Sequence, residues 1–218
     1  MFRAFGWSEF LLLLDGLRWT VALTAIAFAG AAAVGLMLMI LRVAPARPPR
    51  WIAIGVIQGV QGTPVLGVLF VVFFGLPMLI GFDVSRWIAA AVALSVYGGA
   101  FLAEIWRGAV EAIPKGQWEA SASLGLPRRR QLQLVILPQA LAIAIPPTVG
   151  FLVQLIKNTS LASLIGMIEL SRRAQMINST SFEPFVVFGL TALLYFCVCF
   201  PLTRFSRLLE WRLAAARA

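Results

Sequence analysis

The chain of 218 residues is 61% hydrophobic and carries 18 basic and 9 acidic side chains. Charged residues make up 12% of it, about half the share usual in soluble domains, which argues against a water-soluble globular protein. Histidine is absent, so the commonest general base and metal ligand is missing and most hydrolase and metalloenzyme classes lose support. The net charge of +9 is compatible with nucleic-acid binding. However, the basic residues form short clusters between apolar segments, so we expect no nucleic-acid partner.

Five apolar segments are each long enough to cross a lipid bilayer, for which about 20 residues suffice. No internal repeat, low-complexity tract or soluble domain is visible between them. We therefore predict an all-α integral membrane protein with one membrane domain, residues 1–218. Its five transmembrane helices are expected at residues 19–41, 51–82, 87–110, 134–157 and 184–203.

The basic residues predict the orientation of the chain in the membrane. Five crossings place the two termini on opposite sides. With the amino terminus outside, 12 of the 18 Lys and Arg residues lie inside and 6 lie outside, which obeys the positive-inside rule. We therefore expect an external amino terminus and a cytoplasmic carboxyl terminus. The six external basic residues are Arg3, Arg18, Arg86, Lys157, Arg172 and Arg173.

The second apolar segment is too long for a straight span. Its 32 residues would extend about 48 Å as a helix, against a hydrocarbon core of about 30 Å. We expect a bend or break at Gly62-Thr63-Pro64, because proline removes a helix hydrogen bond. Pro146-Pro147 has the same effect in the fourth segment. A simple proline kink and a functional break remain equally open at both positions.

The main inner loop lies between the third and fourth spans. Residues 117–124 contain good helix formers, Gly125 suits the carboxyl-terminal cap of a helix, and Pro127 suits the first turn of another. The loop is therefore predicted to form two short helices around Gly125. Small side chains at Ala120, Ser121 and Ala122 would let another surface approach closely, which favours a docking element. An interfacial amphipathic helix is the alternative, favoured by Trp118 and the arginines at 128–130.

Motifs in and around this loop resemble those of a known family. Glu119-Ala120-Ser121, Gly125, Val135 and Leu137-Pro138 are similar in type and spacing to the signature loop of bacterial ABC importer permeases. Further motifs resemble the polar amino acid uptake subfamily. They are Gly62-Thr63-Pro64, Ala103-Glu104-Ile105, Ile113-Pro114-Lys115-Gly116-Gln117, Ile136-Leu137-Pro138-Gln139-Ala140 and Lys157-Asn158-Thr159-Ser160-Leu161.

The resemblance implies a five-helix permease subunit of a type I importer in the bacterial inner membrane. Such a subunit works with a second permease, a cytoplasmic ATPase dimer and an external amino-acid-binding protein. This chain lacks a GxxxxGK[ST] phosphate loop, so we expect ATP and Mg to bind the partner ATPase and no cofactor to bind this chain. The resemblance assigns ATPase coupling to a short cytoplasmic helix and its cap. The residues concerned are Glu119, Ala120, Ser121, Gly125 and Pro127.

Polar and aromatic side chains at membrane depth are candidates for the substrate pathway. The helical rise places most of them near mid-membrane and Lys157 near the outer interface. The candidates are Gln61, Thr63, Tyr97, Phe151, Gln154 and Lys157. Bonding to a neighbouring helix is the alternative for each Gln and Thr. Lys157 could extend to the outer headgroups or attract a substrate carboxylate. Glu104 and Arg107 are instead expected to form an ion pair near the cytoplasmic surface.

Four positions at three sites depart from the family pattern. Gln61 replaces a frequent arginine, Tyr97 replaces the usual asparagine, and Gly150-Phe151 replace an Asn-Glu pair. The predicted pathway therefore lacks formal charge except at Lys157. Loss of the carboxylate at Phe151 weakens arginine and lysine as substrates and leaves neutral polar, acidic and sulfur-containing amino acids.

Two other classes of protein are alternatives to the importer subunit. A self-contained secondary carrier or channel would be expected to show inverted repeats or intramembrane carboxylates. This chain has five spans and one borderline carboxylate, Glu104. A membrane enzyme would need a nucleophile and base, and no such arrangement is recognisable. A non-catalytic transport subunit is the favoured function.

Overall fold

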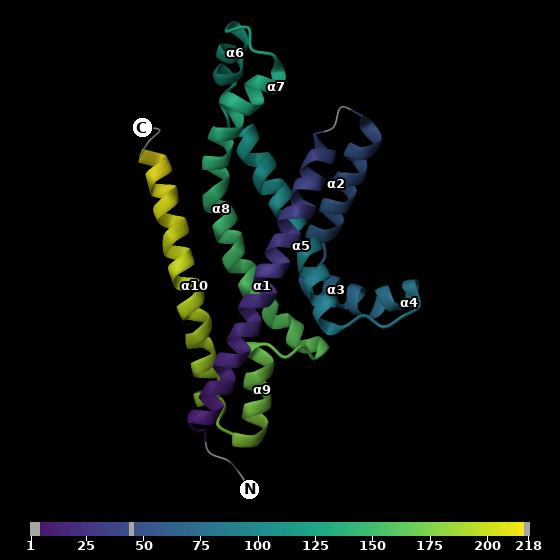
Figure 1. Ribbon diagram of the computed structural model, residues 1–218, viewed down its shortest axis with the longest axis vertical. Coiled ribbons are helices and arrows are strands. Elements are labelled where there is room, and N and C mark those ends of the chain that lie inside the picture. Colours follow the sequence, from purple (N-terminus) through teal and green to yellow (C-terminus); the bar gives the residue numbers. More distant parts are fainter. Residues whose placement is uncertain (1–4, 44–45, 216–218) are drawn as a thin grey trace.

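The computed structural model describes residues 5–43 and 46–215, and every regular element within these ranges is helical (Figure 1). This result confirms the all-α prediction. The α-helices are α1 (Trp7–Arg42), α2 (Arg47–Gln61), α3 (Val65–Phe70), α4 (Leu76–Ile80), α5 (Arg86–Glu111), α6 (Lys115–Ser123), α7 (Arg128–Gln131), α8 (Leu137–Asn158), α9 (Leu170–Ser181) and α10 (Pro184–Ala215). Two π-helical segments, η1 (Val71–Gly75) and η2 (Leu132–Ile136), and one 3₁₀ segment, η3 (Thr159–Ile165), join them.

Four helical stretches in the described ranges are long and apolar enough to cross a membrane. They are α1, α5, the stretch 128–165 that contains α8, and α10. A fifth candidate is α2 taken together with residues 65–80. The helices α1 and α10 extend beyond the predicted spans 19–41 and 184–203, because strong helix formers continue past the apolar stretch at each of these ends.

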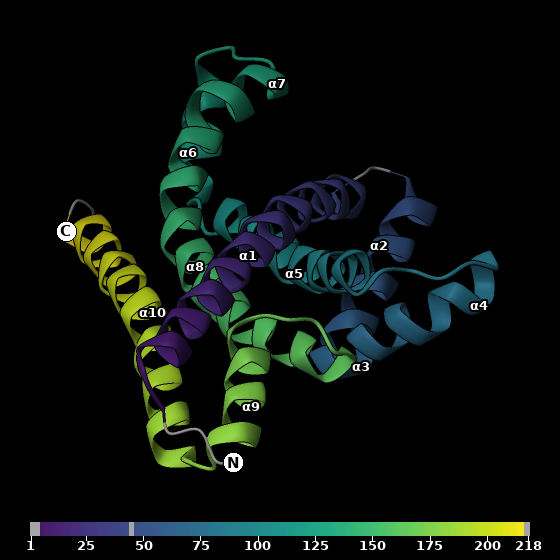
Figure 2. The ribbon, with the colours of Figure 1, turned by 60° about the horizontal axis from the view of Figure 1, so that its bottom comes forward.

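The second apolar segment breaks where its proline predicted. The helix α2 ends at Gln61, and the helical stretch that begins at Val65 is turned by 107° from it. Residues before proline are disfavoured in the helical region, which explains why Thr63 leaves the helix. Its hydroxyl donates to the Gly59 carbonyl at 2.8 Å and so satisfies one of the free carbonyls at the helix end. The stretch from α3 to α4 then runs sideways from the body (Figures 1 and 2).

The proline pair of the fourth segment does not break its helix. The helix α8 is continuous through Pro146 and Pro147, so the possibility of a break there is wrong. Only two backbone hydrogen bonds are lost, and contacts with neighbouring helices hold both sides of the pair. Ser206 of α10 donates to the Pro146 carbonyl at 2.8 Å, and the Trp106 indole of α5 donates to Thr148 at 3.1 Å.

The core is built on a close contact between α1 and α5. Small residues line this contact, and a Cβ added at Gly99 would lie 2.5 Å from Cγ1 of Val34. The same cluster continues to Phe151 of α8 and to Met167 beyond η3. The helix α10 packs on α8, and α9 packs against both α1 and α10 near the beginnings of these two helices (Figure 2). Neither η3 nor α9 was predicted, because both lie between apolar segments.

Candidate functional site

The predicted docking loop forms one end of the molecule. The helices α6 and α7 stand beyond the body of longer helices (Figure 1). Gly125 between them has φ +73, a conformation that favours glycine. Its N–H donates to the Ala122 carbonyl at 2.9 Å and that of Leu126 donates to the Ser121 carbonyl at 3.4 Å, the pattern of a glycine-capped helix end. The prediction of two short helices around Gly125 is confirmed.

Four of the five residues assigned to coupling are exposed, namely Glu119, Ala120, Gly125 and Pro127. Ser121 is 2% exposed and its hydroxyl donates to the Trp118 carbonyl at 2.9 Å. Its small side chain therefore faces the body of the protein. Leu124, which is 79% exposed, extends the outward surface of the loop.

The loop is fixed to both long helices that enter it. Trp118 packs against a cluster that joins Ile113, at the end of α5, to Ile136 and Ala140, at the start of α8. The Gln139 side chain donates to the Gln117 side chain at 3.3 Å. A force applied to α6 would therefore move the ends of α5 and α8 with it.

The six predicted pathway residues lie in two places. In the first, Tyr97 and Phe101 of α5 have ring centroids 4.8 Å apart, and Phe101 stacks on Phe151 of α8 at 5.5 Å. Gln61 donates to the Ala100 carbonyl at 3.3 Å. Gln61 therefore forms the hydrogen bond to a neighbouring helix that was its alternative role. The Thr63 hydroxyl instead donates to the Gly59 carbonyl of the preceding helix.

Gln154 and Lys157 lie on another face of α8, and both are exposed. The Gln154 amide donates to Asn158 at 3.2 Å. Both residues line a groove of about 300 Å³ between α8 and α10. The α10 side of this groove is polar, with Thr203, Ser206, Arg207 and Glu210. Sequence reasoning missed these four, although their spacing of three, four and seven residues marks one helix face.

The predicted Glu104–Arg107 ion pair is present, with Nη2 and Oε2 2.7 Å apart. The structure adds Arg42 at the end of α1, whose Nε lies 2.8 Å from Oε1 of Glu104, and Glu111, which also pairs with Arg107. The cluster ties the ends of α1 and α5 together. Across the described ranges, no group of three metal-ligating side chains is found.

An all-α membrane body with an exposed, glycine-capped helix between two of its spanning helices defines a class of transport subunit. Residues 25–215 match the family described as "binding-protein-dependent transport system inner membrane component", and the chain belongs to this family of ABC importer permease subunits.

Similar proteins within this family are amino acid permeases. The chain is 35% identical to the "probable amino-acid ABC transporter permease protein YckA" of Bacillus subtilis, over 95% of this chain and 91% of that protein. It is 34% identical to the "L-cystine transport system permease protein TcyB" of the same organism, over 93% and 86%. A crystal structure of "an amino acid ABC transporter with histidines" matches with a TM-score of 0.89 and 28% identity, over 94% and 95% of the two chains.

Proposed function

We propose that this chain moves a polar amino acid from an external binding protein into the cytoplasm by alternating access, driven by ATP hydrolysis on a partner. The exposed helix α6 carries the proposal, because it offers a docking surface in a family of transport subunits that depend on binding proteins. The proposed partners are an ATPase dimer, which binds ATP and Mg, a second permease of the same or a related chain, and the external binding protein.

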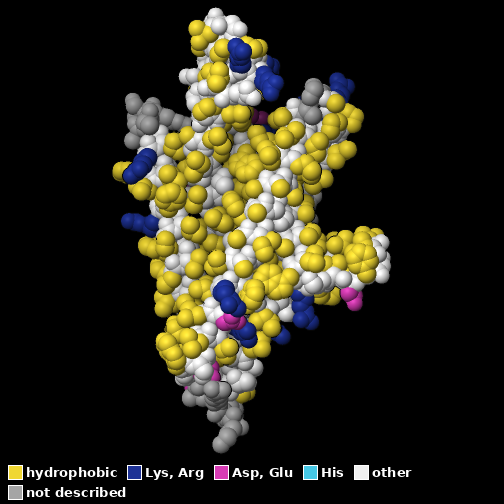
Figure 3. All heavy atoms as spheres, viewed as in Figure 1, with side chains coloured by type: hydrophobic (Ala, Val, Ile, Leu, Met, Phe, Trp, Pro, Cys, Tyr) yellow, Lys and Arg dark blue, Asp and Glu magenta, His cyan; other side chains and the backbone are white. Residues whose placement is uncertain are grey.

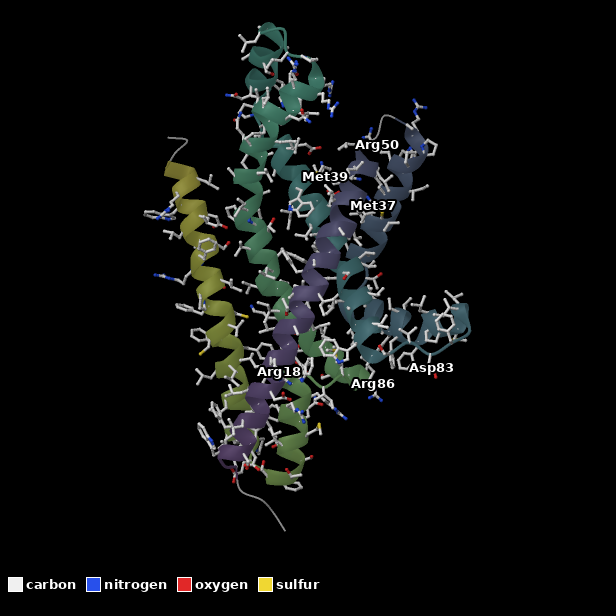
Figure 4. The ribbon with its side chains drawn as sticks, viewed as in Figure 1. Arg18, Met37, Met39, Arg50, Asp83 and Arg86 are labelled. Carbon is white, nitrogen blue, oxygen red and sulfur yellow. The ribbon has the colours of Figure 1, made fainter. Side chains whose placement is uncertain are left out.

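The proposed orientation places α6 and α7 in the cytoplasm of a bacterial cell, with the amino terminus outside. Arg50 lies at the same end as α6 (Figures 1 and 4), and Arg128, Arg129 and Arg130 form α7. Such a concentration of basic residues favours the cytoplasmic side. Arg18 and Arg86, which belong to the smaller basic set, lie in the half of the molecule farther from α6 (Figure 4).

Coupling in this proposal is mechanical. The surface formed by Glu119, Ala120, Gly125 and Pro127 would contact the ATPase, with Ser121 supporting it from beneath. Because α6 is packed on the ends of both α5 and α8, closure of the ATPase dimer would tilt these helices as rigid bodies. The open and closed states of the ATPase dimer must contact α6 differently, because only a difference in contact can shift the permease between its outward-open and inward-open states.

Neutral polar, acidic or sulfur-containing amino acids are the proposed substrates. The aromatic stack of Tyr97, Phe101 and Phe151 offers no carboxylate to a cationic side chain. Relatives are named as permeases for cystine, glutamine and arginine. This variety fits a family that shares one framework and differs in the amino acid side chains it accepts.

Charge reversal on α6 tests the proposal. In proteoliposomes that contain the permease, its ATPase and its binding protein, Glu119→Lys and Gly125→Asp are expected to lower ATP-driven amino acid uptake more than about tenfold. Glu119→Lys reverses a charge on the docking surface, where a mismatched charge costs several kcal/mol. Gly125→Asp places a side chain at the α6 cap, where φ +73 favours glycine. Asp83→Lys is the matched control, since Asp83 is exposed on the sideways arm, away from α6 (Figure 4), and should retain uptake. Full uptake by both α6 variants, at equal amounts in the membrane, would contradict the coupling role.

A further inference from the structure

The groove between α8 and α10 is more polar than the predicted pathway. Each helix contributes four residues with the same spacing along the chain, so that one stripe of α8 faces one stripe of α10. The α8 stripe is Gly150, Val153, Gln154 and Lys157, and the α10 stripe is Thr203, Ser206, Arg207 and Glu210.

The register of the two helices places this groove within the apolar body. The helices run antiparallel (Figure 1), and the Ser206 hydroxyl donates to the Pro146 carbonyl at 2.8 Å. Pro146 is central in the predicted fourth span, residues 134–157. Ser206 therefore lies near mid-depth, and Glu210 lies about 6 Å nearer the cytoplasmic end. Lys157 lies about 16 Å from Pro146 toward the outer end. The last apolar residue of α10 therefore does not mark where that helix leaves the membrane.

The charges that line the groove have no ion-pair partners among the described residues. Lys157, Arg207 and Glu210 are exposed, and none of them forms an ion pair with another described residue. Figure 3 shows basic side chains along the part of α10 nearer α6, beside a surface that is otherwise largely apolar. Unpaired charges at such depth are costly against lipid. This face must therefore meet water, a solute or protein.

The chemistry of the three charged groups matches the backbone of an amino acid. A free amino acid carries a carboxylate and an ammonium on the same carbon. The planar guanidinium of Arg207 can bind a carboxylate with two parallel hydrogen bonds, Lys157 adds positive charge along the groove, and Glu210 can accept hydrogen bonds from an ammonium. The volume of about 300 Å³ lies at the small end of ligand sites.

We propose that the α8–α10 groove binds the zwitterionic backbone of the transported amino acid, with Arg207 at its carboxylate and Glu210, three residues further along the same helix, at its ammonium. Lys157 lies further along the groove toward the outer end, where its positive charge attracts the carboxylate. Gln154 and Thr203 then lie beside the bound backbone, where they can contact the amino acid's side chain. This inference rests on the proposed transport function. The predicted pathway was nearly uncharged, whereas this groove would recognise the carboxylate and the ammonium that all amino acids share.

Measuring amino acid binding directly to the permease tests this groove, because the external binding protein, which has its own selectivity, is left out. The wild-type permease–ATPase complex in lipid nanodiscs is incubated with labelled L-glutamine, L-cystine, L-glutamate or L-arginine. For the amino acids that bind, Arg207→Gln and Glu210→Gln should each weaken binding at least about tenfold, the effect of losing one charge-assisted hydrogen bond. Arg204→Gln is the matched control. Arg204 is exposed on the same helix but does not line the groove, and its loss should change binding less than about twofold.

Blocked ligands assign each end of the amino acid. The α-amide lacks the carboxylate and the N-acetyl derivative lacks the ammonium. In the wild-type complex, both derivatives should displace the labelled amino acid poorly. In Arg207→Gln, the affinity of the α-amide should rise relative to that of the free amino acid. In Glu210→Gln, the relative affinity of the N-acetyl derivative should rise. If a neutral variant does not assemble, Arg207→Lys and Glu210→Asp serve in its place, with a smaller loss expected.

Accessibility distinguishes a ligand groove from an interface between copies of the chain. With Cys197→Ser and Cys199→Ala as background, Gln154→Cys, at an exposed position of the groove that binds neither charged end of the amino acid, should react with a charged thiol reagent, and a bound amino acid should slow the reaction. Lack of reaction, as expected if a second copy covers the groove, would overturn the proposal. So would equal binding by Arg204→Gln, Arg207→Gln and Glu210→Gln, or ATP-driven uptake by a wild-type complex that binds none of the four amino acids. Absence of ATP-driven uptake by wild type would instead overturn the transport function itself.

Discussion

Glu169 is a buried carboxyl group at the point where α1, α9 and α10 meet, and it is 0% exposed. It accepts hydrogen bonds from the Thr20 hydroxyl at 3.2 Å, the Tyr195 hydroxyl at 3.0 Å and the Arg172 N–H at 2.8 Å. The Leu170 N–H donates in turn to the Thr20 hydroxyl at 3.1 Å. Burial is the largest influence on the carboxyl and raises the pKa of Glu169 above its ordinary value.

The raised pKa predicts that the folded protein loses stability as the pH rises. The folded state holds the Glu169 proton more tightly than the unfolded state does. The stability linked to this proton is therefore complete below the ordinary pKa and is lost as the pH rises through the raised one. Glu169→Gln should flatten this pH dependence in thermal unfolding of detergent-solubilised permease. Glu183→Gln, which removes a partly exposed carboxyl at the same end, should leave the pH dependence in place, and an unchanged profile in Glu169→Gln would contradict the assignment.

Truncation of the same side chain should be more damaging than its neutralisation. Glu169→Ala leaves the buried hydroxyl of Thr20 without its acceptor and removes the acceptor for Tyr195 and for the first turn of α9. A loss of about 2–4 kcal/mol is expected from unpaired buried polar groups. A melting temperature equal to that of Glu169→Gln would show that these hydrogen bonds contribute little.

Single residues were predictable where their partners are close in sequence. Gly125 follows a short helix and precedes Pro127, and Glu104 lies three residues before Arg107, so local rules were sufficient for both. The partners of Glu169 lie 149 and 26 residues away along the chain. The position of Arg207 depends on how α10 is aligned with α8. Such relationships follow from tertiary packing, which a local pattern does not contain.

The α1–α5 contact shows how closely two of the spanning helices approach each other. A Cβ at Gly99 would lie 2.5 Å from Cγ1 and 2.7 Å from Cβ of Val34, well inside normal contact distance. A Cβ at Gly35 would meet the Gly99 carbonyl oxygen at 3.0 Å. Small residues at such positions permit close packing of membrane helices, so this seam fixes the separation of α1 and α5.

Gly99→Ala is therefore expected to destabilise the protein by about 1–3 kcal/mol, the usual cost of overfilling a packed interface. Gly108→Ala is the matched control, because Gly108 lies on the same helix and a Cβ there would meet nothing within 4 Å. Its effect should be neutral or slightly stabilising, since alanine favours helix more than glycine does. Thermal unfolding in one detergent compares the two, and equal melting temperatures would contradict the close contact.

The two proline sites explain why element boundaries were only partly predictable. Both remove backbone hydrogen bonds, yet only Gly62-Thr63-Pro64 ends a helix. At that site Gly62, Thr63 and Pro64 separate α2 from α3, and each of these helices packs against α5 on its own. At Pro146-Pro147, hydrogen bonds from Ser206 and Trp106 hold the helix on both sides of the pair. Proline predicts a weak point in a helix, and the neighbouring helices decide whether it opens.

At the scale of the whole molecule, an apolar body separates two ends that carry many of the charged groups. Figure 3 shows apolar side chains over most of the visible surface, with dark-blue groups at the α6 end, toward the opposite end and along part of α10. Hydrophobic composition alone predicted that the chain spans a membrane. The sideways course of α3 and α4 was not anticipated, since the direction of a chain after a break depends on tertiary packing. The helix α9 was not anticipated because it lies between two apolar spans. Arg3 and Arg217, which entered the count for orientation, lie outside the described residues.

The distribution of basic residues makes the orientation testable with two single cysteines. Leu124, 79% exposed beside α6, and Met176, 42% exposed on α9, lie at opposite ends of the molecule (Figure 1). In a background of Cys197→Ser and Cys199→Ala, a membrane-impermeant thiol reagent added to intact cells with permeabilised outer membranes should label Met176→Cys and leave Leu124→Cys unlabelled. Inside-out vesicles should give the opposite result, provided that the permease is expressed without its ATPase, which would otherwise shield Leu124. Labelling of Leu124→Cys in intact cells would place α6 outside, where no cytoplasmic ATPase could reach it, and the positive-inside assignment and the coupling role would fail together.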